Sequence, residues 1–313
     1  MKKAWLLVIM VPLFLSSCTS KVDERTWTKQ QFIDIVEQHY INDKTGTIRT
    51  YGTTDNEEYL LESMGLYYAW LVKVGEQQKA QKIEQAIFSQ FAHQKQQQLF
   101  LSWRIENTEK ATSTSWIDDR RIIEQLPTTS TEKQRLLATI EQTQMVGNLV
   151  MDFYDWQQKK ASKRVVLSYG GDMPALKQVY SKAVKQGAPF FPEYYMVKTK
   201  KFTTLNKVHM VDQLLIAMNS EQAGESTHQF WQWLEQEWQT QDKLSGNYNR
   251  QSKKGDGVQS AAVYALASQY ATMKKNDALA NALKQRGQAL LATNDYKKIH
   301  FFDLIWYAPE TKK

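Results

Sequence analysis

The sequence predicts an all-α fold, an (α/α)6 toroid in which an inner and an outer ring of helices alternate along the chain. Three segments are apolar or small on nearly every side: residues 59–74, 209–218 and 258–273. Three others carry a single polar face: residues 76–94, 226–240 and 276–292. Apolar helices are normally buried, whereas helices with one polar face lie at the surface. The alternation predicts two rings, with loops at one end of the inner helices surrounding a cleft. A plain helix bundle or a solenoid is the alternative, although no repeat of fixed period supports a solenoid.

Capping patterns indicate where the first helices begin. Thr28 followed by Gln31 predicts a capping box that opens a helix reaching about residue 40, because both side chains can satisfy free backbone N–H groups at a helix start. Thr54 with Glu57 predicts a second capping box, which would open the first inner helix.

Hydrophobic spacing predicts most of the other elements as helices. These are expected over residues 76–94, 115–126, 131–158, 173–187, 206–223, 226–240, 258–273, 276–292 and 299–307. The total is about eleven helices, with one short strand expected over residues 99–105. No linker rich in proline, glycine or serine divides the chain, so we expect a single domain over residues 27–313.

Residues 1–17 have the layout of a secretory signal peptide and are not expected to belong to the fold. Two lysines precede an apolar run, and small residues lead to Cys18, the only cysteine. The run is too short to span a bilayer comfortably. This arrangement resembles a bacterial lipobox, which implies cleavage before Cys18, lipid such as palmitate on its thiol, and a tether over residues 18–26. The protein would then be a lipoprotein at the outer side of the cell membrane. An ordinary signal peptide with a chance cysteine is the alternative.

Composition excludes several classes of protein. With 42% hydrophobic residues the chain can build a sizeable core, which excludes general disorder. The net charge of +7 suits anionic lipid or cell-wall polymer nearby, and no nucleic-acid-binding motif accompanies it. The histidines lack metal-ligand spacing, and the sequence has no phosphate loop or nucleophile elbow. We therefore expect no metal, no organic cofactor, no nucleic-acid partner and a monomeric protein.

Glu62 is the leading catalytic candidate, because it lies in a helix that is apolar on almost every side. After Tyr59 the only polar side chains before Val74 are those of Glu62, Ser63 and Lys73. A carboxyl group in such surroundings has a raised pKa unless it is paired, and a raised pKa suits a general acid near neutral pH. A paired structural carboxylate at a helix interface is the alternative.

A second acidic feature lies at the start of a later helix. Asp118 and Asp119 are adjacent there, and two arginines follow them. Acidic residues in a first helical turn gain from the helix dipole, so helix-start electrostatics with an arginine partner is one interpretation. The other makes one of these aspartates the partner of Glu62 across a cleft. Two carboxyl groups flanking a bond are the usual equipment for glycoside hydrolysis.

These residues carry a resemblance to a known enzyme family. Residues 62–67, Glu-Ser-Met-Gly-Leu-Tyr, resemble the acid-bearing element of glycoside hydrolase family 8, and residues 115–126 resemble its aspartate-rich element. The similarity extends through Tyr248 with Gly246 and Asn247, residues 260–271 and residues 301–306. It is closest to the divergent (α/α)6 lipoproteins near families 8 and 126. The resemblance implies a hydrolase that degrades an extracellular polysaccharide. Inversion of configuration would require carboxyl groups about 6.5–9.5 Å apart.

The sequence departs from the family pattern at positions that would fix the mechanism. Leu61 stands where the family usually has serine, and Ile117-Asp118-Asp119 replaces an Asp-Gly-Asp pattern. Which aspartate takes the family role therefore stays open. The later element that supplies the family's catalytic base is not found. Asp212 is the only comparable acidic residue on an inner helix in that region, and it is a weak candidate for the base.

Six further residues are predicted to bind the substrate. Flat rings stack on the apolar faces of sugars, while polar groups meet the hydroxyls. The predicted contacts are Trp116, Arg121, Tyr194, Tyr195, Tyr248 and Trp306. For each aromatic ring taken singly, packing in the core is the alternative.

Two other functions are compatible with the same sequence. A lipoprotein that binds polysaccharide or cell-wall polymer without cutting it would use the same cleft, and the missing base favours this alternative. A structural or adhesion lipoprotein would instead have a closed toroid centre packed with side chains. The family resemblance points both to β-1,4-linked polymers and to α-glucans, so the sugar and its linkage stay open.

Overall fold

The structure, a computed structural model, describes residues 27–310 apart from residues 56, 171–173, 187 and 293–294. The predicted signal peptide of residues 1–17, the lipidation site Cys18 and the tether of residues 18–26 lie outside the described residues. Within the described part of the chain, no helix is both long enough and apolar enough to cross a bilayer.

Helices are the main regular structure. In chain order they are α1 (Lys29–Ile35), α2 (Leu61–Lys73), α3 (Gln77–Ala86), α4 (Trp116–Gln125), α5 (Thr131–Thr143), α6 (Lys177–Ala183), α7 (Met210–Gln222), α8 (His228–Gln241), α9 (Ala261–Met273), α10 (Asp277–Leu290) and α11 (Phe301–Ile305). Single turns of π-helix extend α1 and α3, as η1 (Val36–Tyr40) and η2 (Ile87–Phe91). The 3₁₀ turns are η3 (Leu167–Tyr169), η4 (Pro174–Leu176) and η5 (Tyr296–Lys298). The predicted capping box of Thr28 and Gln31 is confirmed at the start of α1.

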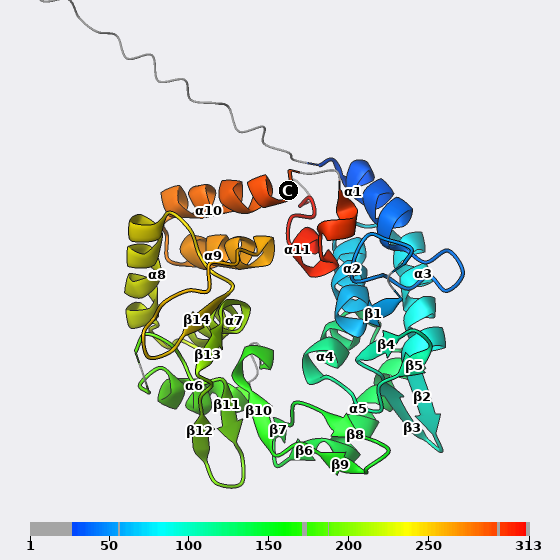
Figure 1. The fold of residues 1–313 in the computed structure, drawn as a ribbon. Coiled ribbons are helices and arrows are strands. Elements are labelled where there is room, and N and C mark those ends of the chain that lie inside the picture. The colour runs from blue at the N-terminus through cyan, green and yellow to red at the C-terminus, as the bar shows by residue number, and fades with distance from the viewer. Residues whose placement is uncertain (1–26, 56, 171–173, 187, 293–294, 311–313) are drawn as a thin grey trace, which may run out of the picture.

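The helices are arranged as a ring (Figure 1). Neighbouring inner helices contact one another in the order α4, α2, α11, α9 and α7, and the turn η3 packs on α7. The outer helices α3 and α10 pack on α2 and α9, the helices that precede them in the chain. A ring in which inner and outer helices alternate agrees with the predicted helical architecture.

Short antiparallel strands accompany the helices, so the all-α prediction holds for the framework but not for the loops. The strands are β1 (Glu58–Leu60), β2 (Ala92–Lys95), β3 (Gln98–Leu101), β4 (Arg104–Glu106), β5 (Glu109–Lys110), β6 (Met145–Val146), β7 (Leu149–Val150), β8 (Tyr154–Asp155), β9 (Lys160–Ala161), β10 (Arg164–Val166), β11 (Tyr194–Met196), β12 (Lys201–Thr203), β13 (Lys207–His209) and β14 (Asn247–Asn249). They form small sheets in the orders β1-β4-β5, β10-β11-β12, β13-β14, β2-β3, β6-β7 and β8-β9.

Helix α2 begins differently from the prediction. Thr54 and Glu57 do not cap it, because Glu58–Leu60 is a strand that pairs with β4. The backbone N–H of Leu61 instead donates to the carbonyl oxygen of Trp103 at 3.0 Å. A loop from another part of the chain therefore satisfies the first turn of α2 and is tied to it.

Helix α5 ends at Thr143, and the prediction that it continues to residue 158 is wrong. Val146 and Leu149 pair instead in the hairpin β6–β7. Its two-residue turn begins at Gly147, whose φ is +62°. Glycine adopts positive φ without steric cost, and Gly-Asn between apolar residues is a hairpin signal. Local turn chemistry therefore overrides the helical spacing.

Two hydrophobic clusters hold the inner helices in place. One is built mainly on α1 to α4 and α11, and the other mainly on α6 to α10. In α2 the side chains of Leu61, Met64 and Leu71 are fully buried. Each such burial contributes about 1.5–3 kcal/mol. The first turns of these helices are therefore firm positions from which to present side chains.

Candidate active site

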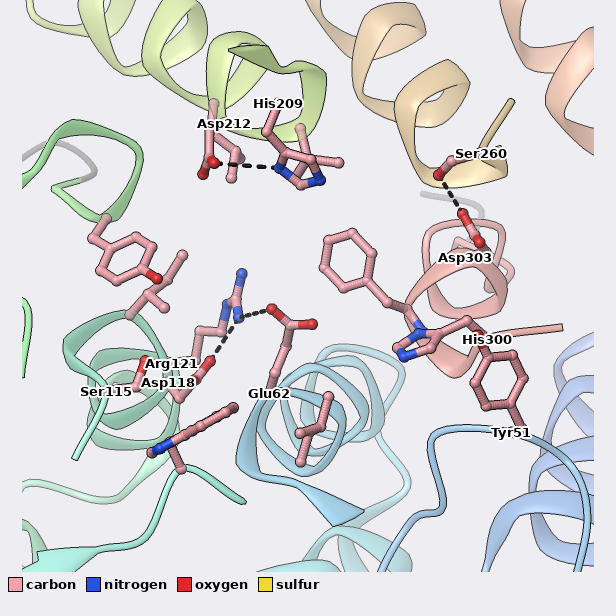
Figure 2. Close-up of a pocket in the computed structure, with 17 residues that line it drawn as sticks. Tyr51, Glu62, Ser115, Asp118, Arg121, His209, Asp212, Ser260, His300 and Asp303 are labelled. Atoms are coloured by element: carbon pink, nitrogen blue, oxygen red, sulfur yellow. Dashed lines mark hydrogen bonds and ion pairs between the residues drawn. The ribbon is translucent and has the colours of Figure 1, made fainter. Parts of the chain in front are cut away.

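A cleft of about 540 Å³ opens at the end of the ring where the inner helices begin. Its acidic residues Glu62, Asp118, Asp212 and Asp303 lie in the first turns of α2, α4, α7 and α11. Ser260 and His300, which also line it, are the N-caps of α9 and α11. The partial positive charge at helix N-termini favours carboxylates at such positions. Figure 2 shows these side chains converging on one space from different sides.

Glu62 lies in the cleft with its side chain about 29% exposed. Its Oε2 is 3.5 Å from Nη1 of Arg121. Burial raises the pKa of Glu62 to about 7; the Arg121 guanidinium opposes this rise, while the charges of Asp118 and Asp212 add to it. A carboxyl group that keeps its proton near neutral pH and is open to a cleft can act as a general acid.

Arg121 joins Glu62 to Asp118. Its Nη1 is 3.0 Å from Oδ1 of Asp118, whose side chain is only 7% exposed. Burial raises the pKa of Asp118, while the Arg121 guanidinium and a hydrogen bond with Ser115 lower it. Helices α2 and α4 approach closely at Gly65, where a Cβ would lie 3.4 Å from the Cβ of Arg121. This close packing of the two helices places the arginine beside the glutamate.

Asp119 does not share this position. It is buried and does not line the cleft. Among the described residues its Oδ1 has no hydrogen-bond partner, and burial, followed by the charge of Asp118, raises its pKa well above the ordinary value. Consecutive residues of an α-helix point about 100° apart. Only one of the two aspartates can therefore face the cleft, and that one is Asp118.

Asp212 lies on the opposite side of the cleft from Glu62 (Figure 2). Its Oδ1 accepts a hydrogen bond from Oγ of Ser168 at 2.7 Å, and its Oδ2 is 3.2 Å from Nδ1 of His209. The side chain is 31% exposed, so water can reach it. The structure thus brings the weak candidate for the base into the same cleft as Glu62.

The wall formed by α9 and α11 carries polar groups that the sequence analysis missed. Oδ1 of Asp303 accepts hydrogen bonds from Oγ of Ser260 at 2.6 Å and from the backbone N–H of Ala262 at 2.7 Å. His300 lines the cleft beside it, and its ring meets that of Tyr51 edge-on at 5.1 Å. The sequence did contain a signal for this part of the site, because Asp303 is an acidic residue near the start of the last helix.

Four aromatic side chains line the cleft, and none of them is among the predicted sugar contacts. They are Tyr51, Trp103, Tyr169 and Phe302. Tyr51 and Trp103 are each 37% exposed, which leaves area free for a ligand. Both lie in loops that precede or contact an inner helix start, a position that only the tertiary fold defines.

Of the six predicted substrate contacts, only Arg121 lines the cleft. Tyr248 is 1% exposed and packs on Trp233 at 5.0 Å, so its prediction as a sugar contact is corrected. Trp116 and Tyr195 are buried as well. Core packing, the alternative interpretation, therefore holds for Trp116, Tyr195 and Tyr248.

The two remaining predicted contacts do not line the cleft either. Trp306 lines a separate groove of about 1100 Å³. The ring of Tyr194 lies under the guanidinium of Arg164, and the ring centre is 4.0 Å from the guanidinium carbon.

Among the described residues, no group of three or more His, Cys, Asp or Glu side chains could hold a metal ion. The cleft is lined by carboxyl groups, imidazoles, one guanidinium, and the hydroxyl groups of serine and tyrosine side chains.

Comparison of sequences identifies a relative. No protein-family model matches the chain. The Bacillus subtilis (strain 168) protein YdaJ, named as a candidate lipoprotein, is 28% identical over 279 residues, which cover 80% of this chain and 75% of YdaJ.

Comparison of structures identifies the fold. PssZ from Listeria monocytogenes matches with a TM-score of 0.75 and 26% identity, covering 90% of this chain and 94% of PssZ. An alpha-amylase from Clostridium perfringens matches with a TM-score of 0.72 and 17% identity, covering 91% and 97%. A cold-adapted family 8 xylanase in complex with substrate matches with a TM-score of 0.63 and 9% identity, covering 93% and 90%. The fold is that of glycoside hydrolase family 8-type enzymes. The predicted resemblance to this family is therefore confirmed at the level of the fold.

Proposed function

We propose that the protein is a glycoside hydrolase that cleaves an extracellular polysaccharide, with Glu62 as general acid and Asp212 as general base. One observation carries the proposal. In a chain with the fold of glycosidases, a carboxyl group with a pKa of about 7 lies across a cleft from a second carboxyl group. Two carboxyl groups on opposite sides of a glycosidic bond are what its hydrolysis requires.

The reaction is a single displacement. Glu62 gives its proton to the glycosidic oxygen as the bond from that oxygen to the anomeric carbon breaks. A water molecule bonds to the anomeric carbon from the other face, and Asp212 takes the proton that this water loses. The configuration is inverted as a result. Arg121, 3.5 Å from Glu62, stabilises the carboxylate that Glu62 becomes.

Asp212 suits the role of base better than the two aspartates proposed from the sequence. Asp118 is nearly buried and is held by Arg121, which also contacts Glu62, so it lies on the side of the acid. Asp119 is outside the cleft. We assign Asp118 the task of holding Arg121 in place, and we propose Arg121 and the exposed rings of Tyr51 and Trp103 as sugar contacts.

The architecture and location follow the same proposal. We infer that the ring is an (α/α)6 toroid in which the 3₁₀ turn η3 takes an inner position between α4 and α7. We further propose a lipoprotein, anchored by lipid on Cys18 at the outer side of the cell membrane and acting as a monomer. The name of YdaJ supports the lipoprotein. The structural relatives include both a xylanase and an alpha-amylase, so both linkage types belong in the test.

The test measures new reducing ends with the full-length protein, purified in a detergent that contains no sugar. The panel holds β-1,4-glucan, α-glucan, xylan and chitosan. We expect one polymer class to be cut by the native protein, and we expect Glu62→Gln and Asp212→Asn to bind that polymer without cutting it. Glu124→Gln, which changes an exposed carboxylate on α4 outside the cleft, is the matched control and should retain the native rate.

The alternatives give different outcomes in the same experiment. A protein that only binds polysaccharide would show equal affinity and no turnover in the native form and both variants. A protein without a sugar site would bind none of the polymers. Either result would overturn the proposed hydrolase.

A further inference from the structure

The carboxylate of Asp212 is held at one oxygen by the turn η3 and at the other by the N-cap residue of its own helix. Oγ of Ser168, in the turn η3, donates to Oδ1 at 2.7 Å. Nδ1 of His209, the N-cap of α7, lies 3.2 Å from Oδ2. Ser168 is only 2% exposed, whereas the His209 side chain is 53% exposed. Asp212 therefore has one partner in the protein interior and one in the cleft.

The backbone of His209 is firmly placed. His209 is the last residue of β13 and pairs there with Asn247 of β14. The next residue, Met210, donates its backbone N–H to the carbonyl oxygen of Gly246 at 2.9 Å. Figure 2 shows the imidazole turned with Nδ1 toward Asp212 and its other ring nitrogen away from that carboxylate. The pairing of β13 with β14 thus fixes the backbone of His209, so that its imidazole lies beside the carboxylate of Asp212.

The charges around His209 favour its protonated form. The hydrogen bond with Asp212 raises the pKa of His209, burial lowers it, and the charges of Asp212 and Glu62 raise it further. Lys207, on the same strand, lowers it. On the neighbouring strand, the side-chain amide of Asn247 donates a hydrogen bond to the carboxylate of Asp256. The charges of Asp256 and Lys207 attract each other. The cleft side of the imidazole therefore faces two carboxyl groups.

We propose that His209 is a positioning residue, which aims the carboxylate of Asp212 at the attacking water. This inference rests on the proposed function. The proton that leaves the water goes to Asp212, and His209 takes no part in the transfer. Loss of the imidazole frees Oδ2 of Asp212 while Ser168 still holds Oδ1, so the carboxylate is no longer fixed toward the cleft.

The first experiment measures kcat and KM for the native full-length protein, His209→Ala and His209→Asn on the polymer that the protein cuts. For His209→Ala we expect kcat to fall about 10- to 100-fold, the loss that a misplaced group causes. We expect KM to stay within about two-fold of the native value, because a misplaced base slows the chemical step without removing a contact to the bound polymer. His209→Asn keeps an N–H donor, so it should recover part of kcat.

A second measurement needs no turnover. The imidazole proton signals of His209, assigned by their loss in His209→Asn, are titrated by NMR in the native protein and in Asp212→Asn. Removal of the carboxylate should lower the pH at which His209 titrates, because Asp212 stabilises the imidazolium. An unchanged titration would overturn the contact.

The outcomes separate this inference from the proposed function. If the native protein cuts a polymer, Asp212→Asn does not, and His209→Ala keeps the native kcat or changes KM alone, His209 has no positioning role and the hydrolase assignment stands. If Asp212→Asn keeps turnover, or the native protein cuts nothing, Asp212 is not the base and the inference and the proposed function both fail. If His209→Ala does not fold, the kcat and KM of His209→Asn decide.

Discussion

The two sides of the cleft hold their carboxyl groups in opposite ways. We call the side of Glu62, Arg121 and Asp118 the acid side, and the side of Asp212, His209 and Ser168 the base side. On the acid side one guanidinium serves two carboxyl groups, of which Asp118 is 7% exposed and Glu62 29% exposed. On the base side one carboxyl group, 31% exposed, has two hydrogen-bonding partners and no guanidinium beside it.

The position of a carboxyl group in a helix does not by itself decide whether the group holds its proton. Glu62, Asp118 and Asp212 all lie in the first turn of an inner helix, where the helix dipole favours a negative charge. Burial nevertheless raises the pKa of Glu62 to about 7. In the proposed mechanism, the neighbours of each carboxyl group and not its place in the helix separate the acid from the base.

The largest effect is expected on the acid side. Glu62→Gln removes the proton donor while keeping the shape of the side chain, and kcat should fall about 10³-fold, within the range for loss of general acid catalysis. In the native protein kcat/KM should decline as pH rises through about 7, because Glu62 loses its proton there. Steady-state kinetics from pH 5 to 9 measure both effects. A decline that persists unchanged in the residual activity of Glu62→Gln would assign that ionisation to another group.

Arg121→Met tests whether the guanidinium holds the acid side together. Its removal leaves Asp118 nearly buried and unpaired, a change that costs about 3 kcal/mol in proteins. Without Arg121 the folded-state pKa of Asp118 rises further above its unfolded value of about 3.9. A raised pKa gives stability at low pH that is lost as pH rises, so the deficit of the variant should grow from pH 4 to pH 7.

Denaturant unfolding at both pH values measures this deficit. Arg120→Met, which removes the pair with the exposed carboxylate of Glu124, is the matched control, and its deficit should change little between pH 4 and pH 7. An equal deficit at pH 4 and pH 7 would show that the lost stability comes from packing rather than from the charge of Asp118.

A smaller effect is expected at the aromatic rim shared by both sides. Trp103→Ala should weaken polymer binding by about 1 kcal/mol, or roughly five-fold in KM, because one stacking ring is lost. Tyr248→Phe is the comparison, since the Tyr248 hydroxyl accepts a buried hydrogen bond from the Ser245 backbone N–H at 2.9 Å. That variant should lose about 1 kcal/mol of stability with KM unchanged. A higher KM in Tyr248→Phe would return that ring to the list of sugar contacts.

The sequence indicates Glu62 because the apolar residues around it lie in the same helix and are close in the sequence. An apolar helix around one acidic residue predicts a buried helix, and most of α2 is buried, while Glu62 itself is 29% exposed at the cleft. The alternation of apolar and amphipathic helices is likewise a local pattern, which is why the helical ring was foreseeable. The Gly-Asn turn at Gly147 indicates a hairpin. The spacing of apolar residues continues across this turn as in a helix, and the prediction followed that spacing.

The rest of the site depends on contacts between distant segments. Asp118 and Asp119 are equivalent in the sequence, and only the close approach of α4 to α2 at Gly65 decides which one meets Arg121 and Glu62. The rings of Tyr51 and Trp103 reach the cleft through loops whose position is set by β-pairing and by the start of α2. No spacing rule along the chain contains that information.

Asp119 gives the smallest expected effect and the sharpest control for the acid side. Burial raises its pKa well above the ordinary value, which favours the neutral acid, and Asp119→Asn puts a neutral amide of similar shape in its place. Activity should stay within about two-fold of the native rate, because Asp119 is outside the cleft.

The stability difference should depend on pH. The folded native protein keeps a proton on Asp119 that the unfolded chain releases above about pH 3.9, so native stability falls as pH rises toward the raised pKa. The asparagine variant has no such proton, and its stability relative to the native protein should increase between pH 4 and pH 7. Unfolding curves at these two pH values decide. A variant that instead loses activity as severely as Glu62→Gln would place Asp119 in the catalytic machinery and would mean that burial alone does not mark a carboxyl group as structural.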